Sequence, residues 1–239
     1  MVDLHGKVAL VTGSSGGIGE AIARGVAARG AKVVVNSTSS VTAGERVADE
    51  LRDATYVHAD IADPNDAARL VAAAVERCGR LDILVNNAGT TETIPHHDLN
   101  AATFDVWERI MRVNVLGTWN VVRAAVPRLR TTGDGVIVNI TSLAGVRPVG
   151  SSIPYATSKA ALNHLTVLLA KALEPEVRVN ALAPGLIDTP WTEDWDDIRA
   201  AVQQTAPLRR SGTPDDVADA GLGLPQQTLL DRARPRKRS

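Results

Sequence analysis

Short runs of β-branched and aliphatic residues alternate along the chain with longer, alanine-rich stretches in which apolar residues recur at helical spacing. The apolar runs predict strands at residues 7–12, 32–35, 55–57, 81–85, 136–140 and 177–181. The stretches between them predict helices at residues 18–29, 42–52, 64–78, 104–130 and 155–173. Such alternation predicts a parallel sheet with helices on both faces. Because crossovers are right-handed, a doubly wound α/β sheet is favoured.

Composition narrows the class of protein. The 239 residues have a formal net charge of −1 and only four Trp, two Tyr and one Phe, so we expect no specific nucleic-acid partner. The single cysteine, Cys78, excludes an internal disulfide, and the spacing of Cys and His predicts no metal site. No apolar stretch is long enough to span a bilayer, and the N-terminus leads directly into a strand pattern. We therefore expect a cytoplasmic protein without a membrane partner.

A glycine-rich turn joins the first predicted strand to the first helix. It reads Thr12-Gly13-Ser14-Ser15-Gly16-Gly17-Ile18-Gly19. Gly13 would permit a tight turn, Gly17 would let the backbone approach a pyrophosphate, and Gly19 would let the helix pack closely on the sheet. The N-terminus of the helix adds free N–H groups and the positive end of the helix dipole. The position favours a dinucleotide site over the alternative, a plain Gly/Ser loop.

The spacing Thr-Gly-x-x-x-Gly-Ile-Gly resembles the short-chain dehydrogenase/reductase family, and further motifs of that family follow in order. They are Asn86-Asn87-Ala88-Gly89, Ser142, Tyr155-Ala156-Thr157-Ser158-Lys159 and Pro184-Gly185. The resemblance covers residues 3–222 and implies a Rossmann-type sheet in a single domain over residues 1–223. It also implies hydride transfer between NAD(P) and a ketone or secondary alcohol, with a 3-oxoacyl thioester as the first specific substrate. Within the family, the chain resembles the 3-oxoacyl-[acyl-carrier-protein] reductases, and this resemblance implies a homo-tetramer.

The candidate acid–base group consists of Ser142, Tyr155 and Lys159. Tyr155 and Lys159 are four residues apart on one predicted helix and share a face. An ammonium at about 4 Å would stabilise phenolate by roughly 4 kcal/mol at an effective dielectric of about 20, lowering the tyrosine pKa by up to about three units. The alternative is that Tyr155 and Lys159 are surface residues of the helix and that Ser142 is a cap at the end of a strand. The resemblance adds Asn114, whose side chain would hold a water that relays protons from Lys159; a packing asparagine is the alternative.

The choice between NAD and NADP depends on the end of the second strand. It reads Asn36-Ser37-Thr38-Ser39-Ser40 and has no carboxylate to repel a 2′-phosphate, while its hydroxyls can donate to one. Gly16 stands where phosphate-preferring relatives often carry Arg or Lys. We expect NADP(H) to be favoured and NAD(H) to remain possible. The resemblance implies these cofactor-binding residues: Gly13, Ser15, Gly17, Ile18, Gly19, Ser37, Thr38, Asp60, Ile61, Asn87, Ala88, Gly89, Tyr155, Lys159, Pro184, Gly185, Ile187 and Thr189.

Residues 186–213 are expected to form a mobile lid over a small-molecule ketone or alcohol. They contain Trp191 and Trp195, with Glu193, Asp194, Asp196 and Asp197 beside them. This pattern fits either an aromatic-walled pocket with an acidic rim or a helix with two core-facing Trp residues. His96 and His97 lie after the fourth strand, near the expected substrate site. Two adjacent His residues without a third ligand favour a loop feature over a metal site.

The C-terminal residues depart from the family pattern. After residues 214–218 the family continues a helix and adds a seventh strand, whereas residues 224–239 form a Pro- and Gln-containing segment with five basic residues among the last eight. We expect this atypical basic tail to be disordered and to result from a reading-frame change; a genuine divergent terminus is the alternative. Loss of the last edge strand would weaken the tetramer. It also leaves a second functional hypothesis, a catalytically silent dinucleotide-binding protein.

Overall fold

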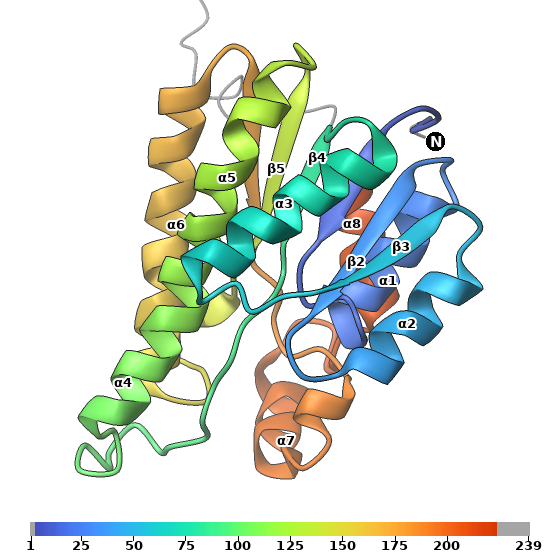
Figure 1. The fold of residues 1–239 in the computed structure, drawn as a ribbon. Coiled ribbons are helices and arrows are strands. Elements are labelled where there is room, and N and C mark those ends of the chain that lie inside the picture. Colours follow the sequence, from blue (N-terminus) through green and yellow to red (C-terminus); the bar gives the residue numbers. More distant parts are fainter. Residues whose placement is uncertain (1–2, 224–239) are drawn as a thin grey trace, which may run out of the picture.

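The computed structural model describes residues 3–223, and in them six parallel strands form one sheet in the order β3-β2-β1-β4-β5-β6 (Figure 1). The strands are β1 (Val8–Val11), β2 (Lys32–Ser37), β3 (Ala54–His58), β4 (Ile83–Asn86), β5 (Gly135–Ile140) and β6 (Val177–Leu182). The chain winds outward from β1 to β3 and then returns to place β4 on the other side of β1. This reversal confirms the doubly wound α/β fold, in which ligands generally bind where the strand order reverses, at the carboxyl ends of the strands.

Helices cover both faces of the sheet (Figure 1). One face packs against α3 (Pro64–Cys78), α5 (Thr118–Arg130) and α6 (Ile153–Leu173). The other packs against α1 (Gly17–Ala27), α2 (Val41–Glu50) and α8 (Pro214–Gly223). Successive strand residues point to opposite faces, so Leu84 belongs to the first core and Val85 to the second. Burial on both faces explains why the strands are continuous apolar runs.

Local signals determine where α3 begins and ends. The side chain of Asp63 accepts hydrogen bonds from the N–H groups of Asn65 and Asp66, and Pro64 occupies the first turn. Gly79 follows the helix in a left-handed conformation at φ 84°, which a glycine adopts without strain. The helix therefore begins and ends where the sequence predicted, at residues 64–78.

The helix predicted over residues 104–130 has the right bounds, but it is not α-helical throughout. The segment is α4 (Phe104–Met111), a π-helical turn at Arg112–Gly117, and then α5. The turn carries the buried Asn114 inward and brings Gly117 against Ile61, where a Cβ on Gly117 would lie 2.9 Å from Cγ1 of Ile61. Helical periodicity does not distinguish a π turn from an α turn, because the deviation depends on these tertiary contacts.

The segment after β6 consists of a 3₁₀ turn at Pro190–Thr192, then α7 (Asp196–Thr205), and a return to the sheet. Two backbone hydrogen bonds close its base: Asp188 N donates to Gly212 O at 2.9 Å, and Gly212 N donates to Leu186 O at 2.9 Å. The expected lid is therefore a compact excursion with a fixed base. Whether it moves stays a prediction.

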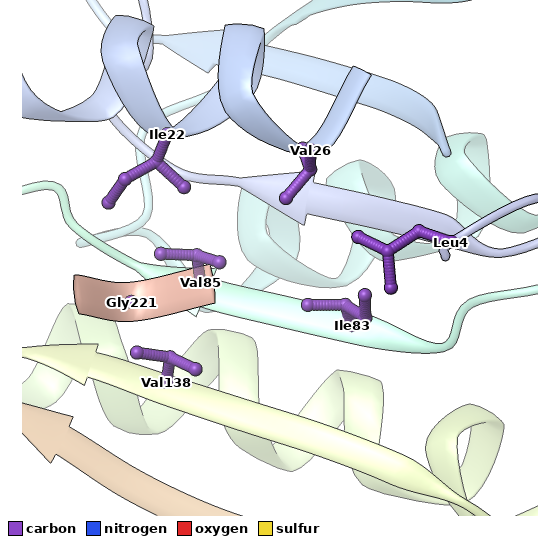
Figure 2. A pocket seen from close by; sticks show the side chains of 7 residues that line it. All are labelled: Leu4, Ile22, Val26, Ile83, Val85, Val138 and Gly221. Carbon is purple, nitrogen blue, oxygen red and sulfur yellow. The ribbon is translucent and has the colours of Figure 1, made fainter. Parts of the chain in front are cut away.

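An apolar gap lies between α1, α8 and the sheet (Figure 2). It is lined by Leu4, Ile22, Val26, Ile83, Val85, Val138 and Gly221. In the described part of the chain, β6 lies at one edge of the sheet. The predictions about the basic tail and the seventh strand fall on residues 224–239, which lie outside the described residues. Within residues 3–223, the search for a helix long and apolar enough to cross a membrane finds none.

Candidate active site

The predicted site residues gather at the carboxyl edge of the parallel sheet. The glycine-rich turn follows β1, the loop with Asn87 follows β4, Ser142 follows β5, and Pro184 follows β6. Leu143 N donates to Pro184 O at 2.8 Å, which joins the ends of β5 and β6 directly. The sheet therefore brings together segments from the two ends of the fold, such as those that hold Gly13 and Pro184.

The glycines of the turn each have a steric reason. Gly13 has φ +62°, and a Cβ there would lie 2.8 Å from Cα of Ala88. A Cβ on Gly19 would lie 2.3 Å from the carbonyl oxygen of Gly13. Gly17 has φ +56° and faces Thr189, whose Cγ2 would lie 3.4 Å from an added Cβ. The turn is thus packed against the β4 loop on one side and against the segment after β6 on the other.

These residues fit a dinucleotide. The N-cap of α1 is Gly16, which has no side chain to cap the N–H groups of the first turn, so these groups can bind phosphate oxygens. Asn87 fixes the backbone of the turn, because its Nδ2 donates to Thr12 O at 3.0 Å and to Gly13 O at 2.9 Å. That contact gives Asn87 a positioning role, while its expected place beside the adenosine stays a prediction.

At the end of β2, Ser37 and Thr38 lie in different environments. Ser37 is buried, and its hydroxyl is 2.9 Å from the phenol oxygen of Tyr56. Thr38 is exposed, and its carbonyl oxygen is 2.9 Å from Nε2 of His58. Ser37 therefore already has a partner, which the sequence analysis missed. Tyr56 lies on the neighbouring strand, and its pairing with Ser37 depends on the β2–β3 register.

Asp60 and Ile61 lie in the loop that follows β3. Asp60 Oδ1 accepts a hydrogen bond from Ala62 N at 2.9 Å, which makes a local turn. Ile61 is buried in the core beneath α5, and its carbonyl oxygen accepts from Nδ2 of Asn120 at 3.1 Å. Ile61 thus packs against the protein interior, and a contact with an adenine ring stays a prediction.

Ser142, Tyr155 and Lys159 are brought together where β5 ends and α6 begins. Ser152 caps α6, which places Tyr155 in the first turn, and the Ser142 hydroxyl hydrogen bonds to the Tyr155 phenol. Lys159 is buried; its Nζ donates to Ile140 O at 3.0 Å and lies 5.7 Å from the centre of the Tyr155 ring. A substrate oxygen beside Ser142 and Tyr155 would meet two hydroxyl groups, one of which can exchange a proton with it.

The expectation that Lys159 lowers the pKa of Tyr155 is wrong for this structure. Burial raises the pKa of the Tyr155 phenol, and the hydrogen bond from Ser142 opposes that rise. Burial also lowers the pKa of Lys159 to about 8. Desolvation disfavours both charged forms, and Nζ is directed at the Ile140 carbonyl rather than at the phenol oxygen. Sequence spacing showed the shared helix face but not the desolvation.

Asn114 links the π-helical turn to two other parts of the site. Its Oδ1 accepts from Thr90 N at 2.7 Å, and its Nδ2 donates to Thr90 O at 3.0 Å and to Ser158 Oγ at 2.9 Å. Ser158 Oγ in turn donates to Tyr155 O at 2.7 Å. Both Nδ2 hydrogens are therefore engaged by protein atoms, so Asn114 connects the β4 loop to α6. No sequence motif indicated Thr90 or Ser158, because both contacts depend on the tertiary structure.

Gly89 completes the contact between the β4 loop and α6. A Cβ at this position would lie 3.3 Å from Oδ1 of Asn114 and 3.6 Å from Nζ of Lys159. An added methyl group would press on the Asn114 side chain and would lie in ordinary contact with the buried amine. The glycine of the Asn-Asn-Ala-Gly motif was the one sequence signal for this approach.

Trp191 and Trp195 do not share a helix, so that alternative is wrong. Trp191 lies in the 3₁₀ turn and Trp195 is the N-cap of α7. The Trp191 ring lies edge-to-face with Tyr155, with centroids 6.3 Å apart and planes at 86°, and is 49% exposed. Trp195 is 6.5 Å from Trp191. The two rings lie one after the other beside Tyr155, and an aromatic-walled substrate pocket with an acidic rim stays a prediction.

His96 and His97 follow β4 in the loop before α4. His96 has a buried Nε2 for which the described residues provide no hydrogen-bond partner, whereas His97 is exposed. Among residues 3–223 there is no group of three or more His, Cys, Asp or Glu side chains that could hold a metal ion.

Comparison with known proteins places this geometry in one family. The family model described as short chain dehydrogenase matches residues 7–200. The chain is 56% identical over 224 residues to a protein of Streptomyces violaceoruber that is named as ketoacyl reductase 2 of the granaticin polyketide synthase, covering 92% of this chain and 90% of that protein. It is 37% identical to the 7α-hydroxysteroid dehydrogenase of Clostridium sardiniense, over 93% of this chain and 87% of that protein.

A solved structure agrees with the sequence comparisons. The 3-ketoacyl-(acyl-carrier-protein) reductase of Brucella melitensis, complexed with NADH, has a TM-score of 0.88 and 35% identity to this chain. The match covers 95% of this chain and 94% of that one. The likeness therefore extends over both the glycine-rich turn and the Ser142–Tyr155–Lys159 group.

Proposed function

This chain belongs to the short-chain dehydrogenase/reductase family, and we propose that it reduces a ketone with a nicotinamide cofactor, using Ser142, Tyr155 and Lys159. It is an oxidoreductase of the class that interconverts keto and CH–OH groups. The observation that carries the proposal is that Ser142 and Tyr155 interact close to the buried amine of Lys159.

The roles of the residues follow from their positions. The Ser142 hydroxyl donates to the substrate carbonyl oxygen and polarises it, and Tyr155 delivers the proton to the same oxygen. Lys159 supplies a buried amine whose pKa of about 8 allows it to lose or gain a proton near neutrality. The cofactor, when bound, supplies the hydride. Asn114 is a positioning residue, because it fixes Thr90 and Ser158 rather than reaching the phenol.

The proposed cofactor is NADPH. No carboxylate follows β2, and exposed Thr38, Ser39 and Ser40 precede α2, where hydroxyls can donate to a 2′-phosphate. Nicotinamide fluorescence titration should show tighter binding of NADPH than of NADH; equal or tighter NADH binding would contradict the proposal. Because Ser37 is paired with Tyr56, Ser37→Asp removes that contact as well as adding charge, so Thr38→Asp is the matched variant to compare with it.

The proposed substrate is a β-keto acyl group, first a 3-oxoacyl thioester. Relatives named as a ketoacyl reductase and, in Synechocystis, as a 3-oxoacyl-[acyl-carrier-protein] reductase support it, the latter at 36% identity over 91% of this chain and 88% of that protein. NADPH oxidation across a panel of ketones and thioesters tests it. Tyr155→Phe should lower turnover by at least about 10²-fold and leave NADPH affinity almost unchanged, because only the proton donor is removed.

Two outcomes would redirect the assignment. Most activity retained in Tyr155→Phe would exclude Tyr155 as the proton donor. Tight NADPH binding with no turnover on any ketone would favour the catalytically silent dinucleotide-binding protein. Self-association into the tetramer implied by the family resemblance is a separate proposal, which light scattering on the full chain can test: a monomer would contradict it.

A further inference from the structure

We propose that His58 makes the choice between NADPH and NADH depend on pH, because its protonated ring supplies a positive charge for a 2′-phosphate at the end of β2. This role rests on the proposed function, since it concerns the cofactor of the same site. In a doubly wound sheet a carboxylate about 20 residues after the glycine-rich turn binds the ribose 2′-hydroxyl of NAD, and a nearby arginine accommodates the 2′-phosphate of NADP. His58 ends the neighbouring strand, β3, and no sequence motif indicated it.

The end of β2 has no cation of its own. Residues 37–44, which run from the end of β2 into α2, carry no charged side chain, and Gly16 adds none from the glycine-rich turn. Two arginines of the helices that follow β2 and β3 are engaged in ion pairs: Arg46 with a glutamate of its own helix at 3.0 Å, and Arg69 with Asp66 at 2.9 Å. Hydroxyl groups can donate to a phosphate but cannot neutralise its charge. Selectivity for a 2′-phosphate is therefore increased by a charge from another element.

His58 brings such a charge to this segment. It lies opposite Ser37 in the β2–β3 ladder, and its Nε2 is 2.9 Å from the carbonyl oxygen of Thr38. Because a carbonyl oxygen only accepts hydrogen bonds, Nε2 carries the hydrogen, and the lone pair of a neutral ring is at Nδ1. The side chain is exposed, so Nδ1 can take up a proton while the contact with Thr38 is kept. Protonation then places a full positive charge beside Thr38.

Two oppositely charged side chains of α3 lie near His58. Arg69 Nη2 donates to His58 O at 2.9 Å and to Asp66 Oδ1 at 2.9 Å. The pKa of Asp66 is held below its usual value first by the hydrogen bond from Asp60 N, then by Arg69, and to a smaller extent by the charge of His58. Asp66 favours the protonated ring and Arg69 opposes it, so an added phosphate shifts the balance toward protonation.

On the side of α2, the segment next to His58 is uncharged. Tyr56, two residues earlier on the same face of β3, packs against Gly44 of α2 and has its phenol oxygen 2.9 Å from Ser37 Oγ. The first charged residues of α2 are Glu45 and Arg46, both exposed and beyond its first turn. A phosphate bound at the start of α2 would therefore have His58 as an adjacent cation. Because histidine changes its charge between about pH 5 and 8, selectivity for NADPH should rise as the pH falls through this range.

The test measures a selectivity ratio, the Kd of NAD⁺ divided by the Kd of NADP⁺, by calorimetry on the full chain. His58→Gln keeps a side-chain N–H for Thr38 O but removes the charge. At about pH 6 its ratio should be about 3- to 10-fold lower than that of the parent, and at about pH 8.5 the two ratios should agree. His58→Arg keeps its charge at both pH values, so at about pH 8.5 its ratio should exceed that of the parent. The 2′-phosphate itself gains a proton near about pH 6, but it does so equally with every variant.

His97→Gln is the matched control, since His97 is also exposed but lies in the loop before α4, and it should leave the ratio unchanged at both pH values. A second readout needs no dinucleotide. The midpoint pH of the His58 ring-proton titration, followed by NMR, should be higher with adenosine 2′-monophosphate than with adenosine by about 0.5–1 pH unit, which is the same 3- to 10-fold effect expressed through linkage.

Equal ratios in the parent and His58→Gln at about pH 6 overturn the role of His58, while tight binding of NADP⁺ to both would still uphold the proposed cofactor. Tighter binding of NAD⁺ by the parent contradicts the proposed NADPH preference, and the comparison with His58→Gln then still decides the role of His58. If neither dinucleotide binds, the proposed function fails, and the NMR titration alone decides: an unchanged midpoint overturns the role of His58.

Discussion

The two faces of the sheet are filled to different degrees. The face covered by α3, α5 and α6 contains fully buried Leu10, Leu84 and Ile137 in one continuous cluster. The face covered by α1, α2 and α8 has the apolar gap shown in Figure 2, and Gly221 of α8 is among the residues that line it. On this second face Asn180, which pairs with Val138, has a buried Nδ2 without a hydrogen-bond partner among the described residues.

This difference separates the two halves of the site. Tyr155 and Lys159 belong to α6, on the filled face, whereas the glycine-rich turn leads into α1, on the face with the gap. Close packing resists small displacements of side chains, while a gap leaves neighbouring atoms without partners. The proton-transfer residues therefore have the firmer support, and the cofactor turn depends more on the contacts that Asn87 and Thr189 make with it.

Replacing the side chains of two adjacent β4 residues by alanine should give the largest change in the free energy of unfolding. Leu84 points into the filled face, and Ile83 lines the gap. Leu84→Ala should lower the free energy of unfolding by about 2–5 kcal/mol, and Ile83→Ala by roughly 1 kcal/mol less, because Ile83 already lacks neighbours on one side. Urea unfolding of the two variants measures the difference. An equal or larger loss at Ile83 would show that the gap is closed in solution.

The filled face carries the buried amine of Lys159, and this predicts a pH dependence. Its pKa falls from 10.5 to about 8 on folding, so the unfolded chain binds more protons between these values, and stability should rise with pH. From about pH 7 to about pH 9.5 the gain should be about 2 kcal/mol. Thermal unfolding of the parent and of Lys159→Met checks it. A gain of the same size in Lys159→Met would assign the effect to other groups.

The addition of one methylene group should change stability in opposite directions on the two faces, and its effect in the gap is the smallest that we expect. Val138→Ile adds one methylene to the gap and should stabilise the protein by up to about 0.8 kcal/mol. Val34→Ile adds the same group to the filled face, where Val34 is fully buried, and should cost about 1–3 kcal/mol. Destabilisation by both substitutions, seen in paired melting curves, would remove the distinction between the faces.

Much of the architecture followed from the sequence because its signals are local. Alternating strand and helix patterns indicated the doubly wound sheet, and helical spacing indicated α3, whose ends the structure shows to be capped by Asp63 and Gly79. Asn114 shows the opposite case. Its apolar surroundings suggested only a buried polar residue, while the π-helical turn and the links to Thr90 and Ser158 require three separate segments to meet.

The sequence by itself determined the fold class and the residue types at the carboxyl edge of the sheet, since hydrophobic period and motif spacing are properties of neighbouring positions. Tertiary structure alone decided which of these side chains contact one another. Ser37 hydrogen bonds to Tyr56, Thr189 packs against Gly17, and Trp191 packs edge-to-face on Tyr155. It also reversed the expected pKa shift of Tyr155. The physical reason is that desolvation and side-chain contact depend on atoms from distant segments, which no periodic pattern encodes.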